Sequence, residues 1–400
     1  MHNGVPLKTT ANIDFLANSQ IYKVIDLQEF ISTGIFSKKH CLLLHEYNTD
    51  WSEVLSLDWG AIIITNNQSE RPVSLSIPLI TQLELPYAVG TGDVILISQN
   101  RVDILYRRTS NSNSLFVTER CDHRCIMCSQ PPKEIDDSWR VNECHQLLDL
   151  IDDDVPIIGI SGGEPTLLGK DFLQLLKYAK EALPSTSLHI LTNGCAFEDY
   201  EYVSEVVQIK HPNLLWGIPL YGATPQQHDY HTQTTGSFNK TMHGLYNLGH
   251  ANARIELRIV LTLPIVKEIV NIAEFIQRNL PFVETVALMG IEPVGFARAN
   301  YEKVWCELTV YQNELLEGTK RLLSSGIDTV LYNIPLCHLP NELHDLAVQS
   351  ISDWKNSYRD ECKGCIKIDE CSGFFKSHRQ RFGEQKIEPI QLKRSSTNAF

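Results

Sequence analysis

The sequence predicts an α/β fold: a partial six-stranded parallel (β/α) barrel, with a small β-rich domain before it and a cysteine-bearing extension after it. Strand-length apolar runs alternate with helical spacing in the middle of the chain, which is typical of βαβ units. Before that region, short β-like runs are separated by Asn, Asp, Pro and Gly. The expected parts are a β-rich domain at 1–110, the barrel core at 111–300, the extension at 301–380 and a polar tail at 381–400.

The first 110 residues contain the shortest elements. We expect a short helix at 27–36 and strands at 41–47 and 61–65, where Leu and Ile are consecutive. The runs GDVILIS and RVDILYRR flank Gln99 and Asn100, which predicts a β-hairpin. This part of the sequence contains no pattern that we associate with catalysis.

The polar segment TSNSNS, at 109–114, separates the β-rich N-terminal part from the region where strands and helices alternate. The core strands expected after it are 115–119, 156–161, 188–192, 214–220, 255–262 and 285–290. Segments with helical spacing, such as FLQLLKYAKEAL, connect these strands, and strands joined by helical crossovers form parallel sheets. Six such units either curl into a partial barrel or form an open doubly wound sheet. Periodicity alone does not separate these two outcomes.

Composition restricts the class of protein. Lys and Arg total 35 against 48 Asp and Glu, and the net charge of −13 argues against non-specific nucleic-acid binding. The N-terminal residues do not resemble a signal peptide, and no run approaches the ~18 apolar residues of a membrane span, so we expect a cytoplasmic protein. Cytoplasmic thiols stay reduced, so the 11 cysteines indicate metal binding, catalysis or core packing.

Cys121, Cys125 and Cys128 form a CxxxCxxC loop directly after the first expected core strand. Three thiolates on one short loop can ligate an iron–sulfur cluster and leave one iron open, as a catalytic cluster requires. The alternatives are a zinc loop, which would need a fourth ligand, or a group of core cysteines. His123 lies inside the loop, where we do not expect its ring to reach the same metal.

Two further motifs follow the next two strands. The sequence SGGEPT, at 161–166, ends the second strand, and its two glycines permit close approach to the backbone. Glu164 in this motif can accept a hydrogen bond from a bound ammonium group. The sequence TNG, at 192–194, ends the third strand in the same way. Each motif taken alone is also compatible with an ordinary strand-to-helix turn.

Taken together and in this order, the three motifs resemble those of the radical S-adenosylmethionine (SAM) superfamily, over roughly residues 115–300. The resemblance implies a partial barrel of six parallel strands and a [4Fe–4S] cluster whose open iron binds SAM. It also implies reductive cleavage of SAM to methionine and a 5′-deoxyadenosyl radical, which abstracts hydrogen from the substrate. The cofactors carry this chemistry, while the protein binds, orients and excludes water.

The resemblance also assigns roles to residues. The ligands of the catalytic cluster would be Cys121, Cys125 and Cys128. The other candidates for the cofactor site are Met127, Gly162, Gly163, Glu164, Asn193 and Arg258. Met127 stands where the superfamily often has an aromatic residue, and its thioether can also pack against adenine. Arg258, on the fifth strand, is the best charged candidate for the SAM ribose or carboxylate, with an ion pair to Glu256 or Glu292 as the alternative.

A second group of cysteines lies in the extension. Its members are Cys337, Cys362, Cys365 and Cys371. Four thiolates can hold a second [4Fe–4S] cluster, and zinc is the sharpest alternative because it takes the same ligands. The arrangement resembles the auxiliary-cluster extensions of peptide-modifying radical SAM enzymes, which are implied to bind substrate or pass electrons. Ligation by four protein thiolates would favour an electron or structural role.

The loop CIMCSQPPKEIDD, the stretch IPLYG and the ending CKGCIKIDECSGFF resemble the C-type radical SAM maturases of His-Xaa-Ser systems, over most of the chain. This resemblance implies modification of a ribosomally synthesised precursor peptide rich in His-Xaa-Ser repeats. It further implies a companion radical SAM maturase of the same system and a reductant such as flavodoxin or ferredoxin. The alternatives are a radical SAM enzyme acting on a small molecule or cofactor precursor, and a non-catalytic iron–sulfur or zinc protein.

Four cysteines stay outside both groups: Cys41, Cys144, Cys195 and Cys306. We expect Cys41 and Cys144 to pack as small apolar residues. Cys195 follows the TNG motif near the expected active site, where it could donate a hydrogen or contact substrate, although burial is the commoner role of a free cysteine. His228 and Asp229, just after the fourth strand, either line the substrate entrance or lie on a surface loop.

Overall fold

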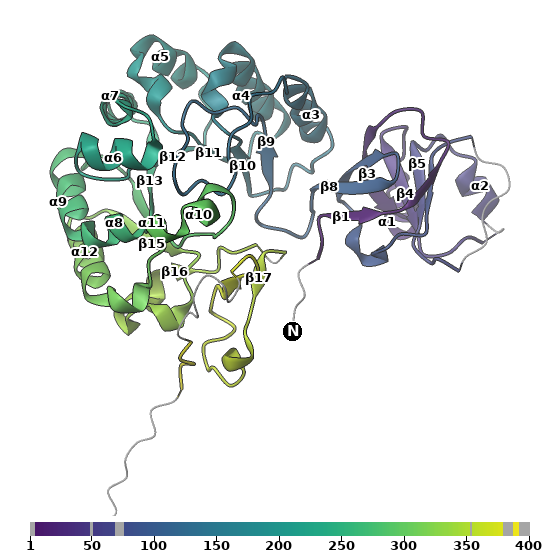
Figure 1. Ribbon diagram of the computed structural model, residues 1–400. Coiled ribbons are helices and arrows are strands. Elements are labelled where there is room, and N and C mark those ends of the chain that lie inside the picture. The colour runs from purple at the N-terminus through teal and green to yellow at the C-terminus, as the bar shows by residue number, and fades with distance from the viewer. Residues whose placement is uncertain (1–4, 49–50, 69–75, 353, 379–386, 392–400) are drawn as a thin grey trace, which may run out of the picture.

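The computed structural model describes residues 5–48, 51–68, 76–352, 354–378 and 387–391. Figure 1 shows a small N-terminal β domain beside a larger α/β core, with the cysteine-bearing extension packed against one end of the core. No helix among the described residues is long and apolar enough to cross a membrane.

The N-terminal domain is built on one mixed sheet, in the order β1-β8-β7-β3-β4-β5-β6-β2. Its strands are β1 (Lys8–Thr10), β2 (Asn12–Asp14), β3 (Gln20–Asp26), β4 (His40–Leu44), β5 (Ala61–Ile64), β6 (Leu79–Thr81), β7 (Val94–Ser98) and β8 (Arg101–Tyr106). Only Ala11 separates β1 from β2, yet these strands lie at opposite ends of the order. Because β1 and β2 are consecutive in the chain, the two edges of the sheet must lie close together, so the sheet curves toward closure. The predicted hairpin at Gln99 and Asn100 is confirmed, because Ser98 pairs with Arg101.

Both faces of this sheet are covered, which explains its unbroken apolar runs. Along β5, Ile63 belongs to one hydrophobic cluster, while Ile62 and Ile64 belong to another on the opposite face. The second cluster includes Trp59 and contacts the helix α1 (Leu27–Thr33), which matches the expected helix at 27–36. The short helix α2 (Ser52–Leu55) adds Leu55 to the same cluster.

The core is a second sheet in which all neighbouring strands are parallel, in the order β16-β15-β14-β13-β12-β11-β10-β9. Its strands are β9 (Ser114–Phe116), β10 (Ile157–Ser161), β11 (Ser187–Leu191), β12 (Leu214–Pro219), β13 (Arg254–Val260), β14 (Thr285–Met289), β15 (Asp328–Tyr332) and β16 (Ala347–Val348). All six predicted strands are present. The expected number of six is too low, because β15 and β16 continue the sheet from a segment that we had assigned to the extension.

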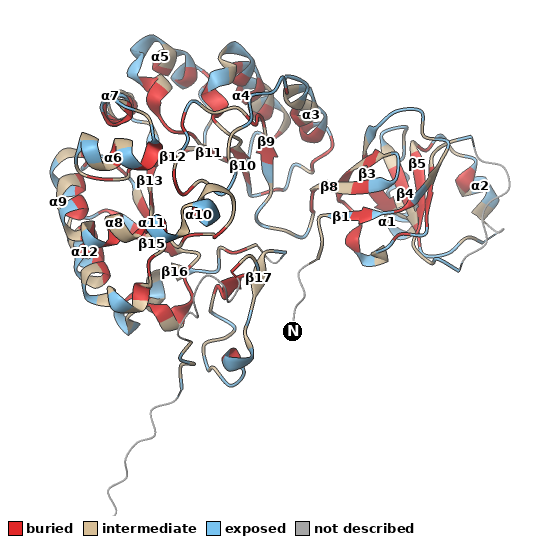
Figure 2. Ribbon diagram, in the orientation of Figure 1, coloured by how far each residue is buried: buried red, intermediate tan, exposed pale blue. Residues whose placement is uncertain are grey.

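Helices cover the outside of the core sheet (Figure 1). The helices of the core are α3 (Trp139–Leu148), α4 (Lys170–Ala182), α5 (Tyr200–Gln208), α6 (Pro225–Thr232), α7 (Ser237–His250), α8 (Leu263–Lys267), α9 (Ile269–Asn279), α10 (Gly295–Ala299), α11 (Tyr301–Val304) and α12 (Gln312–Ser324), of which α10 packs on the cysteine loop rather than outside the sheet. Helix α9 buries Ile269, Ile272, Ala273 and Ile276, the spacing of one helical face. Figure 2 shows the buried residues on the sides of these helices that face the strands. Short 3-10 helices are η2 (Pro86–Ala88), η3 (Pro165–Leu168), η4 (Cys195–Glu198), η5 (Leu308–Val310), η6 (Leu336–His338), η7 (Asn341–Leu346) and η8 (Asp360–Cys362).

The N-terminal domain contacts the core near the end of α3. Val94 and Tyr106 of the N-terminal domain belong to the same hydrophobic cluster as the core strands and helices. Around this contact, Lys39 pairs with Asp149 at 3.0 Å, and Arg108 pairs with Asp152 at 3.2 Å and with Asp154 at 2.5 Å; Lys23 also pairs with Asp152. The joint between the domains is therefore apolar at its centre and ionic at its rim.

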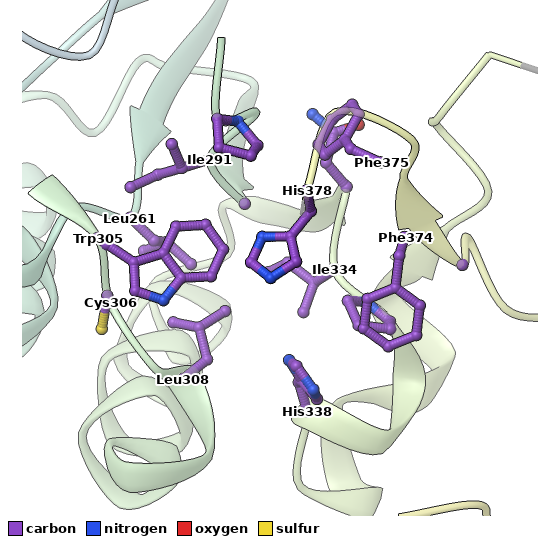
Figure 3. Close-up of a pocket in the computed structure, with 15 residues that line it drawn as sticks. Leu261, Ile291, Trp305, Cys306, Leu308, Ile334, His338, Phe374, Phe375 and His378 are labelled. Carbon is purple, nitrogen blue, oxygen red and sulfur yellow. The ribbon is translucent and has the colours of Figure 1, made fainter. Parts of the chain in front are cut away.

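The extension packs on the core around a pair of short antiparallel strands, β17 (Asn356–Ser357) and β18 (Phe374–Phe375). Figure 3 shows the joint, a cavity of about 40 Å³ between Trp305 and Leu308 on one side and His378 and Phe374 on the other. The rings of Trp305 and His378 stack with centroids 5.0 Å apart. Within the expected tail, of which the structure describes residues 387–391, Ile390 accepts a backbone hydrogen bond from Ile366 at 3.0 Å and packs against the core.

Candidate active site

The three-cysteine loop leaves β9 and is held by backbone contacts on two sides. On one side, the N–H groups of Arg124 and Ile126 donate to the last carbonyls of α6, those of Thr232 (3.1 Å) and His231 (2.9 Å). On the other side, the N–H of Phe296 in α10 donates to the carbonyl of Cys128 at 2.8 Å. The loop that the sequence singled out is therefore clamped between segments that follow the fourth and sixth predicted strands.

The glycines of SGGEPT hold a third side of the loop. The N–H of Gly163 donates to the carbonyl of Thr118 at 2.6 Å, and that of Glu164 donates to the carbonyl of Arg120 at 2.8 Å. A Cβ atom on Gly163 would lie 2.0 Å from the oxygen of Arg120, and one on Gly162 would lie 2.6 Å from the oxygen of Thr118. The backbone that leads into the cysteine loop therefore occupies the space beside these two glycines. Their contact with SAM stays a prediction.

Glu164 joins the second motif to the third. Its side chain is only 1% exposed. One carboxylate oxygen accepts hydrogen bonds from the N–H of Thr166 (3.0 Å) and the hydroxyls of Thr166 (2.6 Å) and Thr192 (2.7 Å), and the other accepts from the N–H of Asn193 (2.6 Å). Burial raises the pKa of Glu164 in spite of these donors. The carboxylate is therefore a structural link between motifs, and its contact with an ammonium group stays a prediction.

Asn193 connects the third motif to the cysteine loop. Its amide nitrogen donates to the carboxylate of Asp122 at 2.6 Å, and its amide oxygen accepts from the N–H of Cys195 at 2.9 Å. Asp122 stands directly after Cys121, so this hydrogen bond fixes the start of the loop. The TNG sequence is consequently more than a turn, since the side chain of Asn193 contacts Asp122, the residue after the first candidate ligand.

The three candidate ligands are free thiols of intermediate exposure. Burial raises the pKa of Cys121 to about 12 and also raises the pKa values of Cys125 and Cys128; charge on neighbouring thiols adds to the effect at Cys121 and Cys125. Binding to a metal would remove these protons. In the part of the chain that the structure describes, no three His, Cys, Asp or Glu side chains surround a single metal ion. That finding concerns a mononuclear site such as zinc, whereas each cysteine of a [4Fe–4S] cluster binds a different iron.

An apolar cluster backs the end of the loop. Met127 is buried there with Ile126 and Ile291, and the partly buried Tyr221 packs against them. Tyr221 follows β12, and its phenol lies near the three thiols: burial raises its pKa well above the usual value, with further contributions from Cys125 and Cys128. The sequence motif IPLYG contains Tyr221, but its position beside the loop was not foreseen. Contact between Met127 and adenine stays a prediction.

A cavity of about 600 Å³ lies inside the core sheet and is lined by residues from most of its strands. Among its polar residues are Ser161, His189, Arg258, Glu292, Tyr332, Asn333 and Lys355. Arg258 forms an ion pair with Glu256, one of the two glutamates that the sequence suggested as its partner. The other glutamate, Glu292, forms an ion pair with Lys355 at 2.8 Å. Burial alone would raise the pKa of Glu256, but His189 and Arg258 lower it below its usual value. The role of Arg258 toward SAM stays a prediction.

The cavity also reaches two segments that sequence reasoning did not connect with a site. Residues 111–114, between the two domains, line one side of it, and residues 348–352 and Lys355 of the extension line another. These segments lie beside β9 and β16, the two ends of the core sheet order. Their polar composition was visible in the sequence, but only the sheet brings them together.

His228 and Asp229 do not line this cavity. His228 is 0% exposed on α6, where its Nδ1 accepts the N–H of Tyr221 at 3.2 Å. Asp229 accepts hydrogen bonds from the N–H groups of Gly236 (2.6 Å) and Phe238 (2.8 Å), at the start of α7. Both residues are built into the scaffold, so neither the substrate-entrance nor the surface-loop interpretation describes them.

The second cysteine group comes together in the extension. Cys337, Cys362, Cys365 and Cys371 all line one small cavity of about 20 Å³. The N–H groups of Leu336 (3.4 Å) and Gly373 (3.3 Å) donate to Sγ of Cys371. Ile387, Pro389 and Ile390, from the expected tail, cover the same cavity. Four thiolates are the ligand set of either a cluster or zinc, but among the described residues these thiols are not placed to hold a single metal ion, and the identity of the metal stays a prediction.

Comparison with known proteins identifies the class of the core. Residues 115–276 match the model of the Radical SAM superfamily. A domain of this superfamily implies SAM and a [4Fe–4S] cluster as cofactors. The chain is 27% identical over 166 residues to a Fe-coproporphyrin III synthase of Methanosarcina barkeri, covering 41% of this chain and 40% of the relative. It is also 27% identical over 145 residues to a GTP 3′,8-cyclase of Peptoclostridium acidaminophilum, covering 35% and 43%.

The chain thus spans about two-fifths of the length of these curated relatives. Among solved structures, it is similar to Streptococcus suis SuiB bound to the precursor peptide SuiA, with a TM-score of 0.44 and 14% identity. That alignment covers 56% of this chain and 48% of SuiB.

Proposed function

We propose that the protein is a radical SAM enzyme that cleaves SAM reductively and modifies a ribosomally synthesised peptide of the His-Xaa-Ser type. The observation that carries the first half is the clamped loop of three cysteines, joined by SGGEPT and TNG at one end of a parallel sheet. The superfamily domain at 115–276 supports it. When bound, the cluster and SAM together supply a 5′-deoxyadenosyl radical.

The chain's own residues would prepare the site for this chemistry. Cys121, Cys125 and Cys128 would hold the cluster, while Glu164 and Asn193 keep their loop in place through hydrogen bonds to neighbouring motifs. The apolar cluster around Met127 would exclude water from one side of the loop. The interior cavity would receive the substrate, with Arg258 and Lys355 each already neutralised by a glutamate.

Reconstitution under anaerobic conditions tests the first half of this proposal. We expect the protein to convert SAM to 5′-deoxyadenosine in the presence of a strong reductant, and the Cys125→Ala variant to lose this activity. Chromatography of the products measures it. A Cys125→Ala protein that still forms 5′-deoxyadenosine would refute the assignment of the catalytic loop.

The peptide half of the proposal rests on the four-cysteine pocket and the motifs of the maturase resemblance. We expect mass spectrometry to detect a mass change in a His-Xaa-Ser precursor peptide after incubation with the enzyme, its reductant and, where needed, the companion maturase. An unmodified peptide, under conditions in which SAM is cleaved, would contradict it.

A small-molecule substrate is the second candidate, because the two curated relatives are by name a synthase of Fe-coproporphyrin III and a cyclase of GTP. The interior cavity of about 600 Å³ is large enough for a metabolite. Modification of a small molecule without any change in the peptide would favour this second function.

A further inference from the structure

Cys195 lies directly behind the three-cysteine loop and is buried there. Its Sγ is 3.6 Å from Nε2 of His123 and 3.5 Å from the hydroxyl of Thr241. Its N–H donates to the amide oxygen of Asn193 at 2.9 Å, and the hydroxyl of Thr241 donates to the carbonyl of the same residue at 3.1 Å. Cys195 is therefore attached to the third motif and to α7, and it presents its sulfur to the loop.

His123 receives this contact between two candidate ligands. It stands two residues after Cys121 and two before Cys125, and its ring is 3% exposed. Among the described residues, Nδ1 of His123 has no hydrogen-bond partner, so the sulfur of Cys195 provides the polar contact that orients the ring.

A second buried imidazole stands beside His123. His228 is 0% exposed, and its Nε2 also lacks a hydrogen-bond partner within the described parts of the chain. Burial, followed by the proximity of His123, lowers the pKa of His228 to about 3. Nδ1 of His123 and Nε2 of His228 both lack hydrogen-bond partners among the described residues, so the sulfur of Cys195 is the polar contact on the His123 ring.

We propose that Cys195 is a positioning residue for the catalytic loop, acting through His123 on the backbone between Cys121 and Cys125. The inference rests on the proposed function and requires no contact between Cys195 and SAM or substrate. Hydrogen bonding and exposure around the ligands set the reduction potential of an iron–sulfur cluster. A shift of the ligand loop by a fraction of an ångström therefore changes both the reduction potential of the cluster and the geometry in which SAM is presented.

Cys144 provides a matched control. It is also a buried free thiol, but it lies on α3 within the main hydrophobic cluster, where its sulfur is 3.9 Å from the carbonyl oxygen of Phe116. Replacing either cysteine with alanine removes one sulfur from the interior. Only the change at Cys195 removes a contact with the loop.

The test compares Cys195→Ala, Cys195→Ser and Cys144→Ala in the full-length reconstituted protein. We expect Cys195→Ala to fold and load iron like the wild type, while the SAM-sensitive electron paramagnetic resonance signal and its midpoint potential shift. Uncoupled formation of 5′-deoxyadenosine should fall by about tenfold to a hundredfold, the range expected for a misplacement near 1 Å. Cys195→Ser, which keeps a polar contact, should restore part of the signal, and Cys144→Ala should match the wild type.

The possible outcomes distinguish a failure of this inference from a failure of the proposed function. A Cys195→Ala protein with the wild-type spectrum, potential and SAM cleavage overturns the inference and leaves the proposed function intact. Equal shifts in Cys144→Ala also overturn it, because they assign the effect to core packing. A wild-type protein that cannot cleave SAM overturns both. If Cys195→Ala does not fold, Thr241→Val, which removes a second polar contact of the thiol, should produce the same spectral shift, and an unchanged spectrum refutes the inference.

Discussion

Gly163 occupies the tightest contact of the candidate site. Its missing side chain lets the backbone of SGGEPT approach Arg120 directly before the first cysteine, and Glu164 extends the same contact to TNG. The three motifs therefore contact one another and hold one another in place. Any binding of SAM would depend on a loop that they have already fixed.

Gly163→Ala should disrupt this arrangement. A Cβ atom 2.0 Å from the carbonyl oxygen of Arg120 forces the two backbone segments apart, which should cost about 1–3 kcal/mol, as for other overpacked sites. We expect less iron per chain after reconstitution and a lower urea midpoint for the core. Iron analysis and circular dichroism measure both.

Gly90→Ala is the matched control, since the nearest atom to the new Cβ would be a carboxylate oxygen of Asp93 at 3.6 Å. This change in the N-terminal domain should leave the iron content unaltered. Equal iron loading in Gly163→Ala and the wild type would show that the loop tolerates separation from SGGEPT.

At the scale of elements, α6 supports the loop with its final carbonyls and contains the buried His228. Burial lowers the pKa of His228 to about 3, against a usual value near 6.5. The unfolded chain therefore binds a proton first as the pH falls. The stability due to neutral His228 is complete above about pH 6.5 and is lost progressively between that pH and about pH 3.

By pH 5 this linkage should remove about 2 kcal/mol from the stability of the core. We expect His228→Asn, whose amide oxygen can still accept the N–H of Tyr221, to weaken the dependence of the unfolding midpoint on pH between 6.5 and 5. Denaturant titrations at several pH values measure the slope. His243→Asn, an exposed change on α7, should keep the wild-type slope, and the same slope in His228→Asn would contradict the prediction.

The extension makes a separate prediction about metal content. If the four thiols around the small cavity hold a second [4Fe–4S] cluster, Cys371→Ala should lower the iron content from about eight to about four per chain while SAM cleavage continues. Iron, sulfide and zinc analyses of both proteins measure this. About four irons together with one zinc in the wild type would assign the pocket to zinc instead.

At the scale of the whole molecule, the ionic rim between the two sheets is the feature most open to test. Arg108→Glu would place a negative charge beside Asp152 and Asp154, and like charges at this distance repel. We expect faster proteolysis of the linker at 109–114, because the N-terminal domain separates more often from the core. SAM cleavage should change little, since the three-cysteine loop is held by core segments.

Arg101→Glu is the control for this charge reversal, because Arg101 pairs with Asp103 within the N-terminal domain. Its cleavage rate at the linker should resemble that of the wild type. If the two variants are cut equally fast, the rim does not hold the domains together.

Much of this organisation was predictable because it depends on local patterns. Alternating strands and helices, the hairpin at Gln99 and Asn100, and the order of the three motifs follow from periodicity and turn residues. The full extent of the core sheet was not predictable, because β16 has only two residues and β15 lies beyond the region in which strands and helices alternate regularly. Cys195 and Tyr221 showed no distinguishing signal beyond their place after a strand.

The sequence by itself determined the class of the core and the residues with metal-binding chemistry, because cysteine spacing and strand-end motifs are properties of short segments. Only the tertiary structure decided what those motifs touch. The glycines of SGGEPT contact the backbone that leads into the cysteine loop, the carboxylate of Glu164 is buried among hydrogen-bond donors, and residues of the expected tail partly cover the second cysteine pocket. The physical reason is that contacts between segments far apart in the chain depend on how the sheet brings strand ends together, which no local pattern encodes.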